Sequence, residues 1–515
     1  MNSRAQYTGS SLRLIAIAAV CSYVLACGSA KDGLSFVSST QNPLVAKYFV
    51  SCQNGGRARV EFGTDTSYGR QTAWYRVPAG GSGLFILVAG MKASTTYHMR
   101  AEVRSNASSW FDKDRVFVTG PVASAKFPIL TVTRLRSTAE VASENPGVEL
   151  INLTEPGVNI IQAVVADRDG NPIWYYDVGT AQANLPIPIK LISNGHLLVN
   201  IQSGTTGATL LREIDLAGDT IRQMDAATLQ EKLRNAGHTL NELTFHHDFL
   251  PLDNGHLIVL GSAVQNFYNL PGYPDSTQVF GDVLIELDSN WEPVWFWSAF
   301  DHLDVNRHLM GLPDWTHSNA VVYTPNDGNL LLSMRNQSWI IKIDYRDGIG
   351  SGDILWRLGR QGDFTITGGD PSQWFYAQHF PSLVETDSLA LTMAIFDNGN
   401  LRILDDKATE CGSPGGPACY SRATIFRIDE STRIATLLWQ DAPGAYSFWG
   451  GSINQLLNGN VEFDMSAPFP TIKGSRVLEV TQTDMPQTVW QMDILKGHAY
   501  RAYRIPSLYP GVSWK

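Results

Sequence analysis

Positive charge is scarce in this sequence. Its 515 residues include 39 Lys and Arg against 49 Asp and Glu, which gives a formal net charge of −10. No clustered basic stretch stands out, so nucleic acid is not an expected partner, because a phosphate binder needs a basic face. Only 17% of the residues are charged, whereas Gly numbers 45 and Trp 14, and no long helical period occurs. This composition favours a large core built from short strands and turns.

Cysteine is also rare, at five residues. Cys411 and Cys419 flank a loop that is dense in turn-forming residues, which favours a disulfide in an oxidising compartment. Zinc ligation is the weaker interpretation, since no His or second Cys pair stands nearby with zinc spacing. Cys52 is left over, and we expect it to be a buried thiol. We expect no bound metal and no cofactor.

Long hydrophobic runs are absent as well. The apolar run at residues 14–20 is too short to span a bilayer, but with Arg4 and Arg13 before it the pattern is typical of a signal peptide. The sequence Val-Leu-Ala-Cys-Gly at residues 24–28 is similar to the processing box of bacterial lipoproteins. We therefore expect residues 1–26 to be a leader and Cys27 to carry the lipid. A plain signal peptide cleaved nearby is the alternative. Either way the chain is expected to be exported, and the lipoprotein interpretation places it in the periplasm with a membrane contact only through Cys27.

A repeating unit occupies the rest of the chain after a short aperiodic stretch. One marker is an Asn-Gly or Asp-Gly turn followed by an apolar run, which predicts a hairpin; copies begin at Asn194, Asn254, Asp327 and Asn458. A second marker is an apolar strand that closes on Asp or a near equivalent, followed by a turn and often a Trp. Its six copies end at Asp167, Asp215, Asp288, Asp344, Asp429 and Val480. This spacing is typical of four-stranded blades, so we predict an all-β fold with a six-bladed β-propeller over residues 126–515.

Residues 27–125 have a different texture. Residues 59–63 and 97–103 alternate like half-buried strands, and the segment as a whole is similar to a fibronectin type III module. We predict a separate N-terminal β-sandwich in which no chemistry is visible.

Three histidines, His247, His317 and His379, recur at one position of the repeat. The strand before each Asn-Gly turn should be the innermost strand of its blade, so the three imidazoles are expected to meet at one mouth of the central channel. The same position in the first and last repeats is occupied by Ile187 and Gly451. The histidine cluster is therefore confined to three consecutive blades.

Arg335 ends the strand that pairs with the one bearing His317, so it can reach the same pocket. Three imidazoles and one planar guanidinium favour a tetrahedral oxyanion as ligand rather than zinc. In a regular strand His246 points away from the face of His247, which leaves a supporting or a merely structural role open for it.

The residues around these histidines resemble the bacterial aryl-sulfate sulfotransferase family, whose members use no nucleotide sulfate donor. The resemblance covers most of the propeller and reaches both ends of the chain. The matching stretches are His246-His247-Asp248, His317-Ser318-Asn319 with Arg335, Gln378-His379, Phe396-Asp397-Asn398-Gly399-Asn400 and Tyr500-Arg501-Ala502-Tyr503-Arg504-Ile505. The segment from His379 to Phe396 is longer than the family pattern, which puts the strand register near His379 in question.

The resemblance implies an aryl-sulfate sulfotransferase that moves a sulfuryl group from a phenolic sulfate ester to a phenol acceptor through a sulfohistidine, with ping-pong kinetics. It implies His379 as the nucleophile, with His247, His317 and Arg335 holding the sulfuryl oxygens. Residues implied to contact the substrate are Asn319, His246 and Tyr500. The resemblance also raises a homodimer as a candidate assembly.

Two other functions remain open. The three histidines also fit a metal-dependent hydrolase with an open position for water, and the chain also fits a non-catalytic surface lipoprotein whose propeller binds a partner. For a phenol-binding mouth the candidate aromatic residues, with core packing as the competing explanation, are Trp315, Trp374, Phe375, Tyr376 and Trp449.

Overall fold

The computed structural model describes residues 34–105, 109–134, 144–154, 159–179, 184–386, 390–414 and 416–514. The predicted all-β class is confirmed, because this part of the chain holds only two α-helices, α1 (Ala226–Asn235) and α2 (Ala299–His302). Short 3-10 turns occur at Ser124–Lys126, Arg335–Gln337, Arg346–Gly348 and Pro371–Gln373. Residues 1–26 and Cys27 lie outside the described residues. No helix in the described ranges is long and apolar enough to cross a membrane.

Most strands belong to six successive sheets, each with four strands paired in an antiparallel meander. The first three are β35 (Ala499–Ile505), β11 (Val148–Leu153), β12 (Ala163–Ala166), β13 (Pro172–Tyr176); β14 (Leu185–Leu191), β15 (Leu197–Gln202), β16 (Thr209–Ile214), β17 (Thr220–Asp225); and β18 (Asn241–Pro251), β19 (Leu257–Tyr268), β20 (Ser276–Leu287), β21 (Pro293–Ser298). The other three are β22 (Ser318–Thr324), β23 (Asn329–Met334), β24 (Trp339–Ile343), β25 (Ile354–Leu358); β27 (His379–Thr386), β28 (Ala390–Asp397), β29 (Arg422–Asp429), β30 (Ile434–Asp441); and β31 (Ser452–Gln455), β32 (Val461–Met465), β33 (Ser475–Val480), β34 (Thr488–Leu495). β26 (Thr365–Ile366) extends the fifth sheet and β10 (Ile129–Arg134) the sixth.

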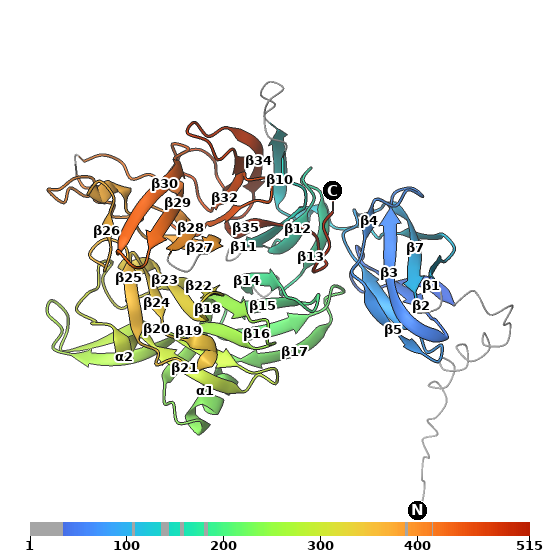
Figure 1. Ribbon diagram of the computed structural model, residues 1–515, viewed down its shortest axis with the longest axis horizontal. Coiled ribbons are helices and arrows are strands. Elements are labelled where there is room, and N and C mark those ends of the chain that lie inside the picture. The colour runs from blue at the N-terminus through green and yellow to red at the C-terminus, as the bar shows by residue number, and fades with distance from the viewer. Residues whose placement is uncertain are drawn as a thin grey trace, which may run out of the picture.

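The six sheets surround a common centre in a propeller-like arrangement (Figure 1). Their first strands lie innermost and contact one another in turn, β14 with β18, β18 with β22, β22 with β27, β27 with β31, β31 with β35 and β35 with β14. Each of these strands except β35 precedes its hairpin turn, as the sequence predicts. The innermost strand of the first sheet is instead β35, which comes from the end of the chain and pairs with β11.

Side chains on the outermost strands join each sheet to the next. The indole N–H of Trp174 donates to the carbonyl oxygen of Leu216 at 2.8 Å. The corresponding bonds run from Trp297 to Gly352, Trp356 to Glu430, Trp439 to Thr483 and Trp490 to Arg168, while Arg222 takes the place of Trp and donates to Ser289. The acceptors lie in the turns that follow the third strands. The repeat's Trp in one sheet therefore donates to the turn that follows the third strand of the next sheet. The Trp490 bond links the last sheet to the first.

The Asp residues of the repeat shape those turns. Asp215 Oδ1 accepts hydrogen bonds from the backbone N–H groups of Ala217 and Asp219, and Asp288 Oδ1 accepts equivalent bonds from Asn290 and Glu292. A side chain that holds the backbone of its own turn explains why Asp closes the strand in the sequence pattern.

The first 118 residues contribute two further sheets around one core. One sheet contains β1 (Ser35–Ser39), β2 (Ala46–Val50) and β6 (Leu84–Val88); the other contains β4 (Arg70–Gln71), β3 (Asn54–Gly63), β7 (Thr96–Arg104), β8 (Ser109–Phe111), β5 (Tyr75–Ala79) and β9 (Arg115–Val118). Neither sheet pairs with the six that follow. The segment between β9 and β10 is where the sequence analysis sets its domain boundary.

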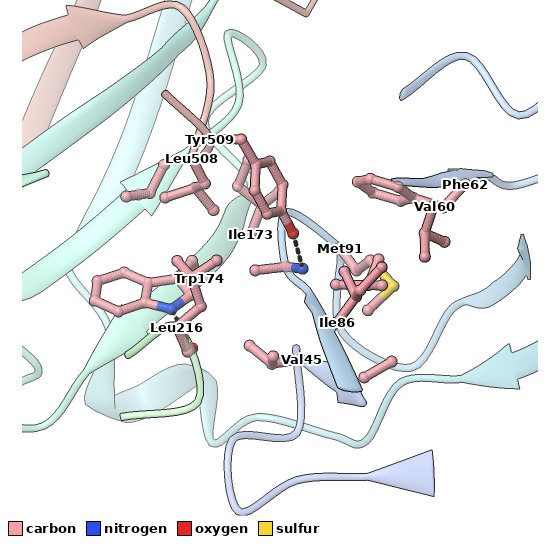
Figure 2. Close-up of a cluster of buried hydrophobic side chains, with 14 of the residues drawn as sticks. Val45, Val60, Phe62, Ile86, Met91, Ile173, Trp174, Leu216, Leu508 and Tyr509 are labelled. Carbon is pink, nitrogen blue, oxygen red and sulfur yellow. Dashed lines mark hydrogen bonds between the residues drawn. The ribbon is translucent and has the colours of Figure 1, made fainter. Parts of the chain in front are cut away.

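The end of the chain packs into this N-terminal region. Leu508 and Tyr509 join a buried cluster that continues from Val60 and Phe62 of β3 to Trp174 of β13 (Figure 2). The Tyr509 hydroxyl accepts the backbone N–H of Ala89 and donates to the Leu87 carbonyl. The N-terminal sheets and the propeller-like part therefore share one continuous apolar core.

The cysteines are placed as the sequence predicts. Cys411 and Cys419 form a disulfide, and Cys52 is a buried free thiol.

A buried acidic cluster lies where the last sheet meets the first. The Arg504 guanidinium of β35 pairs with Glu149 of β11, with Glu462 of β32 at 3.1 Å and with Glu479 of β33 at 2.6 Å. Asp464 is fully buried nearby, and neither of its oxygens has a hydrogen-bond partner. Burial, together with the negative charge of Glu149, raises the pKa of Asp464 well above its usual value. The buried carboxyl groups of this cluster thus outnumber the single guanidinium that balances their charge.

The variant Asp464→Asn is expected to stabilise the protein at pH 8, by about 1–3 kcal/mol, because it removes the cost of a buried unpaired carboxylate. The folded-state pKa of Asp464 is raised, so wild-type stability falls as the pH rises above the unfolded-state pKa and through the folded-state value. The gain should therefore shrink towards pH 4. Urea unfolding followed by Trp fluorescence at both pH values measures it. The exposed Asp484→Asn serves as the control, and an equal gain at both pH values contradicts the assignment.

Candidate active site

Each of the three histidines lies at or directly before a register slip of its innermost strand against the second strand. The slips fall at residues 245–249 in β18, 318–320 in β22 and 379–382 in β27. His247 and His317 have positive φ values of 51° and 48°, which residues other than Gly rarely adopt. Bulges of this kind redirect side chains beside active sites. The backbone therefore turns these side chains out of ordinary strand alternation.

The structure brings the histidines together with Tyr500 and Arg335. The ring centroids of His247 and His317 are 4.6 Å apart, and Tyr500 lies 5.4 Å from His247 and 6.2 Å from His379. The backbone N–H of Arg335 donates to the His317 carbonyl at 3.3 Å. Three consecutive sheets and the C-terminal strand thus supply one cluster of side chains, which is named here the pocket. His379 pairs directly with Phe396, which settles the register that the sequence left in question.

Asn398 fixes the tautomer of His379. The Asn398 amide nitrogen donates to the carbonyl oxygens of Ser447 at 2.7 Å and Gly450 at 3.0 Å, so its Oδ1 must face the imidazole. That Oδ1 lies 2.7 Å from His379 Nδ1, which therefore carries the proton. The Gly450 backbone N–H donates to His379 Nε2 at 3.3 Å. The Nε2 atom of His379 is consequently unprotonated and accepts this long hydrogen bond.

His379 is only 2% exposed. Burial, and next the positive charge of Arg335, hold the pKa of His379 well below 6.5. A neutral imidazole is the form that can act as a nucleophile.

His247 is supported from behind by His246 and Asp282. His246 Nε2 lies 3.1 Å from an oxygen of Asp282, and His246 Nδ1 lies 2.8 Å from His247 Nδ1. One Nδ1 atom donates to the other, and the position of the carboxylate beside His246 Nε2 favours His247 Nδ1 as the donor. The Nε2 of His247 is then free to exchange a proton. Burial, and then the neighbouring His317, hold the pKa of His247 well below 6.5. His247 contacts the pocket, and His246 lies one step behind it.

Arg335 is a cation without an acidic partner. Its guanidinium donates to Asn336 Oδ1 at 2.7 Å and to the Phe448 carbonyl at 3.1 Å, and no carboxylate pairs with it among the described residues. The partly buried Arg335 guanidinium can therefore take an anionic ligand as its counter-ion.

The His317 ring is held in place by a contact between its Nδ1 and Asp314.

Asn319 and Tyr500 offer polar atoms that have no partner in the described structure. The Asn319 amide nitrogen donates to the Gln378 carbonyl at 2.7 Å, but its Oδ1 has no partner, and neither has the Tyr500 hydroxyl. Burial raises the pKa of Tyr500 to about 12, so it remains a phenol at neutral pH. Substrate contact by these residues and by His246 remains a prediction.

Sequence reasoning missed the role of Arg501. Its guanidinium lies 3.1 Å from an oxygen of Asp248, to which Lys190 is also bound, and it also donates to the Asn319 carbonyl. It lies 5.1 Å from the Tyr500 ring centroid. Arg501 and Asp248 thereby connect β35 to β18 and β22 directly beneath the pocket. Only the resemblance to a known family pointed to this stretch, because no local pattern marks an arginine as central.

Two of the other positions of the repeat bend without supplying an imidazole. β14 shifts register between Pro186 and Ile189, around Ile187. Gly451 has a φ of 110°, and a Cβ there would lie 2.5 Å from the Phe396 ring. The bend therefore recurs at the positions that the repeat predicts, whereas the histidines belong to three sheets.

Most of the aromatic residues proposed for the mouth belong to cores. Trp315, Trp374, Phe375 and Tyr376 are buried, each in a cluster between sheets. Packing is thus the correct explanation for these four. The loop that carries Trp449 instead presents Phe448, which is 50% exposed and whose carbonyl binds Arg335. The aromatic surface nearest to the pocket comes from this loop.

No group of three or more His, Cys, Asp and Glu side chains with metal-binding geometry occurs in the described ranges. The pocket as a whole combines a neutral nucleophilic imidazole, a second imidazole able to exchange a proton and an unpaired guanidinium. These groups define a site for group transfer from an oxyanion.

The chain belongs to the Arylsulfotransferase (ASST) family, which matches residues 145–504. This membership indicates a sulfotransferase enzyme and supports aryl sulfotransferase activity, with phenolic sulfates and phenols as the implied substrates. No curated protein matches the chain.

Similar solved structures include a chimera of the proteins named ACO and RPE65, with 12% identity, coverage of 93% of this chain and 95% of that chain, and a TM-score of 0.32. A mutant of the Synechocystis apocarotenoid oxygenase shows 10% identity, coverage of 89% and 82%, and a TM-score of 0.30. These likenesses are too weak to bear on function.

Proposed function

We propose that the protein is an aryl-sulfate sulfotransferase that works through a sulfohistidine on His379. The observation that supports this most is the His379 tautomer, because Asn398 holds the proton on Nδ1 and leaves Nε2 unprotonated, with only a long hydrogen bond from the Gly450 N–H for the sulfur to displace.

In the first half-reaction the Nε2 lone pair attacks the sulfur of a phenolic sulfate ester. An N–S bond forms while the S–O bond to the phenol breaks, and the leaving phenoxide takes its electron pair and a proton from Nε2 of a protonated His247. In the second half-reaction a phenol loses its proton to His247 Nε2 and attacks the same sulfur, which releases His379.

The cations of the pocket act on the sulfuryl oxygens. Arg335 offers a planar pair of N–H donors, and we place His317 beside it as a further donor. Burial, and then the neighbouring His317, lower the pKa of His247. The negative charge of a bound sulfate opposes these effects and favours the protonated form that the leaving group needs.

We extend the proposal to the architecture and location of the chain. The six sheets would be the blades of one closed six-bladed propeller, and the N-terminal sheets a fibronectin type III-like sandwich. The leader at residues 1–26 and a lipid on Cys27 would place the enzyme in the periplasm, held at a membrane, and a homodimer is the assembly to test. Mass spectrometry of the mature N-terminus tests the lipid.

The test of the activity is cleavage of a chromogenic aryl sulfate, with and without an added phenol, in metal-free buffer. Phenol is expected to accelerate release of the chromophore and to become sulfated. Initial rates over both concentrations are expected to give the parallel lines of a ping-pong mechanism. A rate that ignores phenol indicates a hydrolase, and a stoichiometric transition metal whose removal abolishes turnover indicates the metal-dependent alternative. A complete lack of turnover supports the binding-only alternative.

A further inference from the structure

An exposed row of phenylalanines crosses the outer face of the β1-β2-β6 sheet. Phe36 is directly opposite Phe49, and Phe49 is directly opposite Phe85. Their ring centroids lie 4.9 Å and 5.0 Å apart along the row. Phe36 is 42% exposed and Phe85 45% exposed. Neighbouring Leu34, at 64% exposure, extends this surface, which is named here the phenylalanine face.

The phenylalanine face is rigid. The Phe49 ring lies over Gly83, where an added Cβ would come within 2.3 Å of the ring, and Gly83 has a positive φ of 72°. Ile86 and Val88 on the opposite side of β6 are buried in the core. The three rings are therefore held in place by the sheet beneath them. Binding of a partner to these rings costs little side-chain conformational entropy.

Among the described residues the face carries no negative charge, although the chain has a net charge of −10. Its outward positions on the three strands are Phe36, Ser38, Lys47, Phe49, Phe85 and Leu87. The ammonium group of Lys47 lies 4.5 Å from the Phe85 ring centroid. Aromatic rings with a cation and without carboxylates suit the boundary between the headgroups and acyl chains of an anionic bilayer.

The position of the face along the chain points to the same partner. The strand β1 that carries Phe36 is the first strand of the described chain. Residues 28–36, fully extended, reach at most about 32 Å from Cys27, the position proposed for the lipid. A single acyl anchor binds membranes weakly, and a second membrane-binding element makes the attachment stable.

We propose that the phenylalanine face is a docking surface for an anionic phospholipid bilayer. The rings of Phe36 and Phe85 enter the interfacial layer, and Lys47 meets the phosphate groups. This orientation holds the N-terminal sheets against the membrane as a spacer for the propeller-like part.

A second surface of the N-terminal region provides a competing explanation that the test must separate. Arg76, Arg57 and Arg104 form one row across β5, β3 and β7, and the guanidinium groups of Arg57 and Arg104 lie 4.8 Å and 4.7 Å from the Trp74 ring centroid. The sequence analysis did not reveal this row of arginines, of which Arg104 is paired with Glu102 at 2.6 Å. This arginine row lies on the other sheet, and its positive charge alone would attract it to an anionic membrane.

The experiment uses the mature chain carrying Cys27→Ser, so that no acyl chain contributes, and vesicles of phosphatidylethanolamine and phosphatidylglycerol in a three-to-one ratio. The variant Phe36→Ser/Phe85→Ser is expected to lower vesicle binding by about tenfold or more, because two large apolar side chains lose their burial. The matched control is Val116→Ser/Val118→Ser on β9, where both valines are also exposed. This control variant should bind vesicles as strongly as the starting protein.

Three outcomes overturn the proposal. They are no vesicle binding by the starting protein, loss of binding in Arg57→Ser/Arg76→Ser but not in the phenylalanine variant, and a protein dimer that the phenylalanine variant dissociates while vesicle binding is unchanged. The far-UV circular dichroism spectrum should be equal in all variants. This readout confirms folding and does not depend on the proposed function.

Discussion

His379→Asn is expected to abolish sulfuryl transfer, with a fall in kcat/KM of about 10⁴-fold or more, because the variant lacks the nitrogen that forms the covalent intermediate. The fold should survive, since the amide fits within the space of the imidazole. The rate of transfer from a chromogenic aryl sulfate to a phenol measures the effect. In the unaltered protein, donor without acceptor should leave a sulfuryl adduct on the peptide that contains His379, visible by mass spectrometry and absent from the variant.

The matched control is His256→Asn. His256 stands in the turn between β18 and β19, where its Nδ1 contacts Glu286 at 2.7 Å, away from the pocket. It should retain full transfer activity. Substantial activity in His379→Asn, or an adduct on a different peptide, contradicts the assignment of the nucleophile.

Arg335→Gln is expected to lower kcat/KM by about 10²–10³-fold, because the sulfuryl oxygens lose a charged donor in the transition state. It should also change the pH dependence of the rate. Burial and then the Arg335 charge hold down the pKa of His379, so removing the charge lets that pKa rise. The neutral imidazole is the reactive form, and rate is lost as the pH falls through its pKa. The acid limb of the pH–rate profile should therefore move to higher pH in the variant.

Arg335→Lys separates the two effects. It keeps the charge but not the planar fork, so part of the rate should be lost while the acid limb stays near its wild-type position. An acid limb that is unmoved in Arg335→Gln, together with a wild-type rate, indicates that Arg335 serves only to hold the Phe448 loop.

The sequence predicted the parts of the site that depend on repetition. His247, His317 and His379 occupy one position of a repeat, and a repeat places equivalent residues on equivalent strands, so their convergence followed from the pattern. The hairpin turns and the Asp-capped turns were predictable for the same reason, because each is a local structure with its own residue preferences.

The parts that the sequence could not supply depend on contacts between distant segments. Asn398 was visible only as one residue of a matching stretch, and its role needs the carbonyl oxygens of Ser447 and Gly450, which no local pattern connects to it. The sequence could not separate the four buried aromatic residues from true mouth residues, because a large side chain beside a polar motif looks the same in a core as in a mouth. The sequence could not decide which of His246 and His247 faces the pocket. His247 lies at a bulge and has a left-handed backbone conformation, which regular strand alternation does not describe.

The completion of the first sheet by β35 has a consequence for biosynthesis. Tyr500 and Arg501 lie close to the end of a 515-residue chain, and the side chains that seal the core against the N-terminal sheets come later still. A nascent polypeptide therefore holds all three histidines long before it holds the strand that closes around them. A chain truncated before β35 would lack this strand together with Tyr500 and Arg501, and we expect it to be inert.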